Sequence, residues 1–221
     1  WTFLTNKDGH GGKGTLAAAI PGTKSDEIIS ILTAAMGKSV RRKVKEVTCD
    51  LSPSMMLIAS EVFYNAHVVN ERFHVQQVYN EAVDEIRIDI RRRLIAEENN
   101  RDKSVPPKTY SNGETMRQIL ARSKHTLMMS QNKWSEIQRH RVYILFKYHP
   151  ILKSAYTLAM ELRRIFNAQI SPTKAMSRMS KWYEKVMALG NNNFRSVIKT
   201  FKNHAPTILN YFRRRATNAS A

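Results

Sequence analysis

Three side chains in the first half of the chain have types and positions suited to phosphoryl chemistry: Asp50, Glu71 and His74. Asp50 directly follows Val47-Thr48-Cys49, a run typical of a strand, and ligand-binding residues of parallel and mixed sheets lie at the carboxyl ends of strands. Carboxylate oxygens are the ligands that Mg²⁺ prefers, so Asp50 suits metal-assisted phosphoryl transfer. Helix capping is the competing interpretation, because Leu51-Ser52-Pro53 follow at once and Asp is a favoured cap.

Glu71 and His74 lie at the start of a predicted long helix. His74 could orient a ligand or a scissile phosphate, and Glu71 could act as a second acid. A carboxylate at a helix N-terminus is also stabilised by the helix dipole without any function, so a purely structural role stays open.

Other chemistries lack their motifs. The glycine-dense segment 7–14 places Gly14 after Gly12-Lys13, where a phosphate-binding P-loop needs Ser or Thr followed by a helix, so a hairpin turn is favoured and an NTPase is rejected. The other six histidines form no pair at metal-ligand spacing, and with one cysteine a zinc site is not expected. No nucleophile-elbow motif supports a hydrolase.

The composition points to a folded protein that binds a polyanion. Lys and Arg number 36 against 18 acids, which gives a formal charge of +18 and a pI of about 10.2. The single cysteine, Cys49, excludes an internal disulfide and predicts a reducing, cytoplasmic compartment. No apolar run approaches the roughly 20 residues of a membrane span, and no signal peptide is visible. Because the chain starts at Trp1 rather than Met, we expect a piece cut from a longer protein.

The first 98 residues alternate strand-like and helix-like segments. Residues 1–6 and 15–20 are β-rich and flank the glycine-dense turn, which predicts a β-hairpin. Helical patterns begin at the capping residue Ser25, at Pro53 and at Arg72, with short strands predicted over 44–49 and 66–69 between them. The order β-β-α-β-α-β-α predicts an α/β fold in which helices flank a mixed sheet.

Residues 99–221 carry the whole charge excess and show no strand pattern. They contain 23 basic and 5 acidic residues, whereas residues 1–98 contain 13 of each. A polar stretch closed by Pro106-Pro107 predicts a junction between the two parts. Apolar spacing predicts six helices, the first over Met116 to Leu127, the second ending near Pro150 and the fourth capped by Gly190. This part is therefore expected to be an all-helical basic module.

Two runs of residues carry a family resemblance. Val47-Thr48-Cys49-Asp50-Leu51-Ser52-Pro53-Ser54-Met55 and Ala66-His67-Val68-Val69-Asn70-Glu71-Arg72-Phe73-His74-Val75 resemble the core of a bacterial insertion-sequence DDE transposase of the ISL-three type. The turn around Asn6-Lys7 and Gly14-Thr15-Leu16, the segment Asp84-Glu85-Ile86-Arg87 and residues 208–221 match as well. The resemblance spans essentially the whole chain.

The resemblance implies a ribonuclease H-like fold with three metal-binding acids, of which the second falls on Asp50. The first acid belongs to a strand before Trp1 and the third lies just beyond Ala221, so we expect the fragment to lack both and to be inactive by itself. Glu71 stands where the family has an aspartate, two residues before the Phe-His pair. The implied domains are a part of the catalytic core over 1–98, a helical insertion over 99–205 and the start of a returning core helix region over 206–221.

For the intact protein, the resemblance implies Mg²⁺- or Mn²⁺-dependent cleavage and strand transfer of double-stranded DNA. No membrane partner is expected, and the assembly considered is a homodimer. About half of ten basic residues are expected to touch phosphate. These candidates are Arg139, Arg141, Lys147, Arg163, Arg164, Arg178, Lys181, Arg213, Arg214 and Arg215. Trp134 and Trp182 could stack on a flipped base, although their helical apolar positions favour core packing.

Two other functions stay open. One is a non-catalytic DNA-binding module in which the sheet is only a scaffold. The other is a structure-selective ribonuclease H-like nuclease, which would hydrolyse branched DNA without joining strands.

Overall fold

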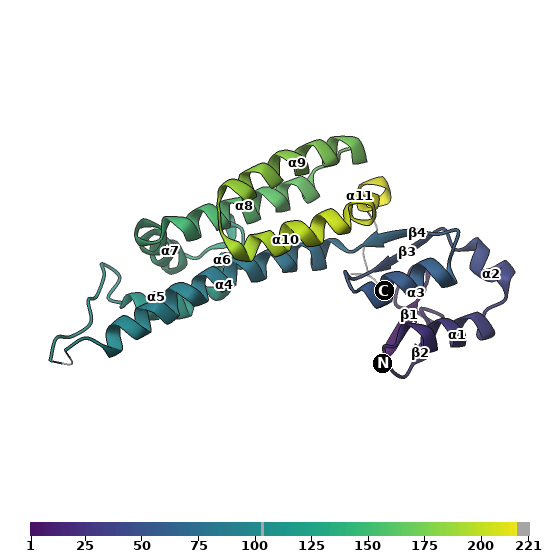
Figure 1. Ribbon diagram of the computed structural model, residues 1–221, viewed down its shortest axis with the longest axis horizontal. Coiled ribbons are helices and arrows are strands. Elements are labelled where there is room, and N and C mark those ends of the chain that lie inside the picture. Colours follow the sequence, from purple (N-terminus) through teal and green to yellow (C-terminus); the bar gives the residue numbers. More distant parts are fainter. Residues whose placement is uncertain (103, 216–221) are drawn as a thin grey trace. The chain divides into compact units, whose positions relative to one another are not determined.

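The structure, a computed structural model, describes residues 1–102 and 104–215 (Figure 1). The chain divides into two compact units: unit 1 comprises residues 1–75, 169–176 and those from 201 onward, and unit 2 comprises residues 76–168 and 177–200. The expected family match of residues 216–221 lies outside the described residues.

The predicted hairpin is confirmed. Strands β1 (Thr2–Thr5) and β2 (Leu16–Ile20) pair antiparallel, and the short 3-10 helix η1 (Lys7–Gly9) lies in the turn between them. Gly11 and Gly14 have φ angles of 78° and 90°, a conformation that glycine adopts without steric cost. The glycine-dense segment therefore serves the turn geometry.

A second pair of strands is parallel. Strand β3 (Glu46–Cys49) pairs with β4 (His67–Asn70), with Glu46 opposite His67 and Cys49 opposite Asn70. The connection between them contains α3 (Pro53–Val62), as a parallel crossover requires. Pro53 occupies the first turn of α3, as predicted.

The described strands form two two-stranded sheets instead of one mixed sheet. To join the two pairs into one sheet, a strand would have to pair with a neighbour on each of its two edges. None of the strands in residues 1–102 and 104–215 does so. The α/β composition of this part of the chain is confirmed, while the single mixed sheet is not present in it.

One apolar cluster holds unit 1 together. Helices α1 (Ser25–Ala35) and α3 pack against each other and bury Ile28, Leu32, Ile58, Val62 and Phe63 together with Ile20 of β2. Leu4 of β1 and Val47 of β3 also pack against this cluster, so both strand pairs contribute to the same core.

One local prediction in unit 1 is wrong, and one short helix was not predicted. Ser25 is the first residue of α1 rather than its cap, because the N-cap position is occupied by Lys24. The basic segment before β3 forms an additional short helix, α2 (Lys38–Lys43), in which the Arg41 side chain is buried and donates from Nε to the Met36 carbonyl at 3.1 Å.

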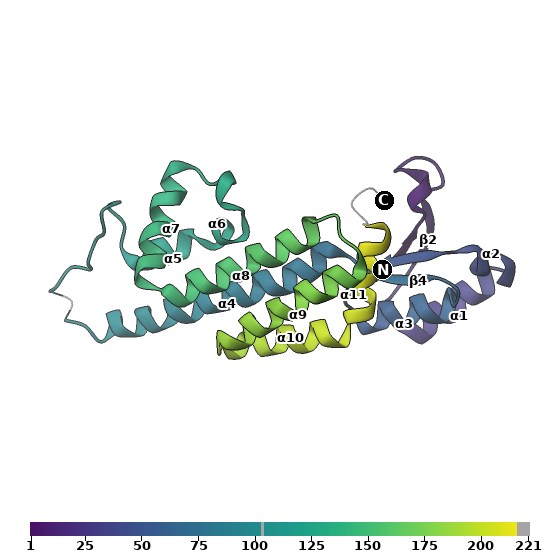
Figure 2. The same cartoon turned by 90° about the horizontal axis from the view of Figure 1, so that it is seen from above.

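Helix α11 (Ala205–Arg214) returns to unit 1 and packs against β4 (Figures 1 and 2). It buries Ile208, Tyr211 and Phe212, and its Asn210 Nδ2 donates to the Val68 carbonyl of β4 at 2.8 Å. A helix on an outer strand occupies backbone groups that would otherwise be open to pairing with another chain.

Unit 2 contains a group of helices around three aromatic side chains. These helices are α4 (Arg72–Asn99), α8 (Pro150–Asn167), α9 (Pro172–Ala188) and α10 (Asn192–Asn203). Tyr79 of α4 stacks on Phe194 of α10 with ring centroids 4.9 Å apart, and Trp182 of α9 lies 5.2 Å from Tyr79. Trp182 Nε1 donates to the Leu158 carbonyl of α8 at 2.9 Å. The cluster of three aromatic rings therefore links all four helices.

The remaining helices of unit 2 are α5 (Met116–Arg122), α6 (Lys124–Met128), the 3-10 helix η2 (Gln131–Lys133) and α7 (Glu136–Tyr148). The single helix predicted over Met116 to Leu127 is wrong, because it breaks at Ser123. The buried Ser123 hydroxyl donates to the Ile119 carbonyl at 2.6 Å, a local bond that competes with helix continuation. Among residues 104–215 no strand is present beyond an isolated bridge of Thr109 to Thr115, so the all-helical prediction is confirmed for them.

We expect Trp182→Ala to lower the free energy of unfolding by about 3–5 kcal/mol, because it removes a fully buried indole and its hydrogen bond. Urea unfolding followed by circular dichroism measures this loss. Met187→Ala, an exposed position on the same helix, is the control and should change stability by no more than about 0.5 kcal/mol. Equal losses in the two variants would contradict the role of Trp182 in joining the helices.

Candidate active site

The parallel pairing of β3 and β4 brings two acids to one edge. Asp50 follows the last residue of β3 and Glu71 follows the last residue of β4, and these last residues, Cys49 and Asn70, lie opposite each other. The Glu71 amide donates to the Cys49 carbonyl at 3.0 Å, which continues the pairing one residue past β4. The acids therefore leave neighbouring strands at the carboxyl edge, where parallel sheets place ligand-binding residues.

Asp50 is held in place at two points. Its half-buried carboxylate accepts from the Ser52 amide through Oδ1 at 2.9 Å, and its backbone carbonyl accepts from Asn70 Nδ2 at 2.8 Å. The N-cap position of α3 is Ser52, so Asp50 leads the chain into the helix without being its cap. In the described part of the chain the second carboxylate oxygen, Oδ2, has no hydrogen bond or ion pair.

The neighbouring thiol does not compete with Asp50 as a ligand. Burial, reinforced by the negative charge of Asp50, raises the pKa of Cys49 to about 12. The thiol is therefore protonated at neutral pH, and a protonated thiol is neither a nucleophile nor a metal ligand.

Glu71 and His74 form a pair at the start of α4. The Glu71 residue is only 8% exposed, and its Oε2 lies 3.4 Å from Nε2 of the half-exposed His74 ring. The Glu71 carbonyl also accepts from the Val75 amide at 3.2 Å, so this residue begins the helix through its backbone. Next to it, Phe73 is 66% exposed and meets the His74 ring edge-on, with centroids 5.5 Å apart.

The chemistry of these side chains fits a hard divalent cation in part. Asp50 and Glu71 offer carboxylate oxygens, the donors that Mg²⁺ and Mn²⁺ prefer. Among residues 1–102 and 104–215, however, no three His, Cys, Asp or Glu side chains come close enough together to hold a metal ion. Asp50 fits the role of one ligand among several and does not make a complete site with its described neighbours.

The ten predicted phosphate contacts separate by exposure. Seven are exposed: Arg139, Lys147, Arg164, Arg178, Lys181, Arg213 and Arg214. Arg141, Arg163 and Arg215 are partly buried. A separate observation concerns membranes: among the helices that the structure describes, none has the length and apolar character of a membrane-spanning segment.

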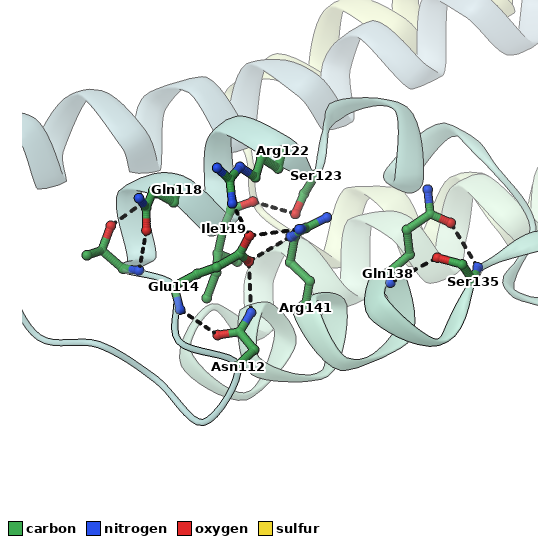
Figure 3. A network of polar contacts seen from close by, with 10 residues as sticks. Asn112, Glu114, Gln118, Ile119, Arg122, Ser123, Ser135, Gln138 and Arg141 are labelled. Carbon is green, nitrogen blue, oxygen red and sulfur yellow. Dashed lines mark hydrogen bonds and ion pairs between the residues drawn. The ribbon is translucent and has the colours of Figure 1, made fainter.

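Arg141 is engaged within the protein by the buried residue Glu114 (Figure 3). Its Nε and Nη2 donate to the two Glu114 oxygens at 2.8 Å each, and the Arg141 side chain is only 13% exposed. Arg122 and Asn112 also donate to this carboxylate. The Arg141 hydrogen bonds, followed by those of Arg122, lower the pKa of Glu114 to about 2, so the carboxylate stays ionised.

Arg163 is also used inside unit 2. It donates to the Met128 carbonyl at 2.7 Å and to Ser130 Oγ at 3.1 Å, which ties α8 to the last residue of α6 and to the segment that follows. Arg163 and Arg141 therefore hold loops in place, a use that sequence patterns of basic residues do not distinguish from phosphate binding.

The exposed cations of α8 and α9 lie on adjoining helix faces. A short connection makes these helices antiparallel, and Lys185 of α9 bridges to Glu161 of α8 at 2.6 Å. Arg164 lies less than one turn beyond Glu161, and Lys181 and Arg178 lie one and two turns before Lys185. We call Arg164, Arg178 and Lys181 the α8–α9 basic face.

Sequence reasoning missed a further stripe on α10. Arg195, Lys199 and Lys202 recur at i, i+4 and i+7 and are all exposed, opposite the buried Phe194, Val197, Ile198 and Phe201. The same spacing that predicted the apolar face of this helix could have found them.

The two tryptophans are core residues. Trp134 and Trp182 are buried, and their indole nitrogens donate to the Thr126 and Leu158 carbonyls at 2.8 and 2.9 Å. Stacking on a flipped base is therefore wrong for both, and the alternative of core packing is confirmed.

A family model of transposases, the DDE group of the ISL-three type, matches residues 2–221. No curated protein and no solved structure matches the chain.

We expect Glu114→Gln to lower the free energy of unfolding by about 1–3 kcal/mol at neutral pH, because two arginines lose a charged acceptor. The pKa of Glu114 is lower in the folded state than its ordinary value of 4.5, so the ionised carboxylate stabilises the fold above about pH 4.5. That contribution is lost as the pH falls from 4.5 towards 2.

Urea unfolding at a series of pH values measures this dependence. The control is Glu97→Gln, at an exposed position of α4, which should keep the acid dependence of the unchanged protein. If Glu114→Gln loses stability on acidification as steeply as the unchanged protein does, the network does not depend on the Glu114 charge.

Proposed function

Because this chain belongs to the DDE transposase family of the ISL-three type, we propose that it forms part of the catalytic region of an enzyme that cleaves and joins DNA strands. The observation that carries the proposal is the position of Asp50 and Glu71, side by side at the carboxyl ends of paired parallel strands. The family makes DNA the substrate, and this edge is where its chemistry would take place.

We propose a ribonuclease H-like arrangement for the core. It is supported by a hairpin and a parallel strand pair that both pack against the apolar cluster of α1 and α3. Residues 1–98 would then form part of this core, residues 99–205 a helical insertion, and residues from 206 the start of the returning core helix region. The packing of α11 against β4 supports the last assignment.

Within the core, Asp50 would be a metal ligand through its Oδ2 oxygen. When bound, Mg²⁺ or Mn²⁺ activates an attacking water or 3′-hydroxyl and neutralises charge that develops on the phosphate. Asp50 would present a fixed carboxylate, since the Ser52 amide already holds its Oδ1 and the Asn70 side chain holds its backbone carbonyl. His74 would orient the scissile phosphate, and Glu71 would hold the His74 ring.

DNA would lie along exposed cations. The α8–α9 basic face offers three of them on adjoining helix faces, and Arg139, Lys147, Arg213 and Arg214 are exposed as well. Contacts of this kind neutralise phosphates and release counterions, which gives affinity without sequence readout.

The isolated chain of 221 residues should bind DNA and leave it uncut. Two acids at one sheet edge do not by themselves hold two metal ions, so we propose that the remaining ligands come from residues outside the described ones. A Mg²⁺-dependent nick made by this chain and abolished by Asp50→Asn would contradict this proposal.

In the full-length enzyme, Asp50→Asn should abolish DNA cleavage in Mg²⁺ and Mn²⁺ while DNA affinity stays unchanged, because the amide removes the metal-binding charge but keeps the size of the side chain. Cleavage of labelled element ends and gel-shift titration measure the two properties. Asp26→Asn, which changes an exposed acid of α1, is the control and should leave both unchanged.

Other outcomes would point to the other functions. Full-length protein that binds DNA but never cleaves it would favour a non-catalytic binding module. Hydrolysis of branched DNA without strand joining would favour a structure-selective nuclease, and full activity of Asp50→Asn would remove Asp50 from the mechanism.

Replacing the α8–α9 basic face by glutamine, in the triple variant Arg164→Gln, Arg178→Gln and Lys181→Gln, should weaken DNA binding and flatten its salt dependence. The slope of log affinity against log salt becomes shallower by about 0.9 for each phosphate that the protein no longer neutralises. A control of equal charge is Lys24→Gln, Lys38→Gln and Lys43→Gln, three exposed cations of unit 1. Equal slopes for the two triple variants would show that net charge, rather than this face, determines binding.

A further inference from the structure

We propose that Thr207 and Asn70 are positioning residues that connect helix α11 to Asp50. This inference rests on the proposed function for its consequence, because it concerns the acid that we place at the catalytic edge. It is independent of the proposed function in its geometry, which lies entirely within unit 1.

Asn70 lies between Asp50 and α11. It is the last residue of β4 and is fully buried, with 0% of its surface exposed. Its side-chain Nδ2 donates to the Asp50 carbonyl at 2.8 Å, and its Oδ1 accepts from the hydroxyl of Thr207 on α11. The same hydroxyl lies 2.9 Å from the His204 carbonyl, so its one proton is shared between the two acceptors. A buried amide with both ends hydrogen-bonded has one defined orientation, so it transmits the position of one partner to the other.

Backbone direction explains why α11 can reach this point. The amides of His67 and Glu71 donate towards β3, to the Lys45 and Cys49 carbonyls, so the alternate residues Val68 and Asn70 turn their backbone groups to the outer edge of β4. Helix α11 packs against that edge, with Asn210 Nδ2 donating to the Val68 carbonyl.

The result is a chain of contacts from α11 to the proposed metal ligand. Thr207 holds Asn70, Asn70 holds the Asp50 carbonyl, and the Ser52 amide holds the Asp50 carboxylate through Oδ1. Together these bonds leave Oδ2 of Asp50 as the oxygen available for a ligand. A helix that follows Asn70 by more than 130 residues thereby helps to fix the orientation of the Asp50 carboxylate.

The test compares three variants in the full-length protein. Thr207→Val keeps the shape of the side chain and removes the hydroxyl, whereas Thr207→Ser keeps the hydroxyl. Asn210→Leu is the matched control, because it also removes a hydrogen bond between α11 and β4 but does not touch Asn70 or Asp50.

The first readout is hydrogen exchange of the Ser52 amide, which needs neither metal nor DNA. We expect Thr207→Val to lose protection at Ser52, while Thr207→Ser and Asn210→Leu retain it. The second readout is the Mg²⁺ concentration for half-maximal cleavage, which should rise about tenfold in Thr207→Val alone, with DNA affinity unchanged.

Unchanged Ser52 exchange in Thr207→Val, or an equal loss in Asn210→Leu, would overturn the inference, since the hydroxyl would then only help α11 to pack. If unchanged full-length protein shows no metal-dependent cleavage, the proposed function fails, and Ser52 exchange still decides whether Thr207 and Asn70 position Asp50.

Discussion

The parallel pairing of β3 with β4 is the constraint on which the candidate site depends. Adjacent parallel strands end at the same edge, so the residues that follow them become neighbours although a whole helix separates them in the sequence. Here those residues are Asp50 and Glu71, and the bond from the Glu71 amide to the Cys49 carbonyl sets their register. A shift of one residue would move the acids apart and turn the side chains of β4 to the opposite face.

Several features of the fold followed from local patterns, and others depended on contacts that a sequence does not display. The hairpin, the position of Pro53 in α3 and the glycine that ends α9 all reflect short-range backbone preferences. The break at Ser123 was not predictable from apolar spacing, because Ile119 and Leu127 keep a helical pattern across it. The helix ends there because the Ser123 hydroxyl donates to the Ile119 carbonyl and competes with the backbone hydrogen bonds. The division of the strands into two sheets was hidden for a similar reason, since propensity identifies strands but not their partners.

The candidate site shows the same division. Asp50 was recognisable because it follows a run typical of a strand, and Glu71 because it lies at the start of a predicted long helix, and both signals are local in the sequence. Asn70 gave no such signal: its importance comes from Thr207, a contact across 137 positions. Among the cations, Arg141 and the exposed Arg178 look alike as sequence, and only the buried Glu114 beside Arg141 separates a structural arginine from one that is open to solvent.

Ion pairs between the few acids and some of the basic residues also explain why the surface of the second part of the chain is strongly positive. Residues 99–221 have only five acids, and two of them, Glu114 and Glu161, are already paired with Arg141, Arg122 and Lys185. Few carboxylates then remain to offset the exposed cations of α8, α9 and α10, which must repel one another along the helix faces. An extended polyanion relieves that repulsion at many positions at once, and because it does so through phosphate charge, the same surface can serve DNA of any sequence.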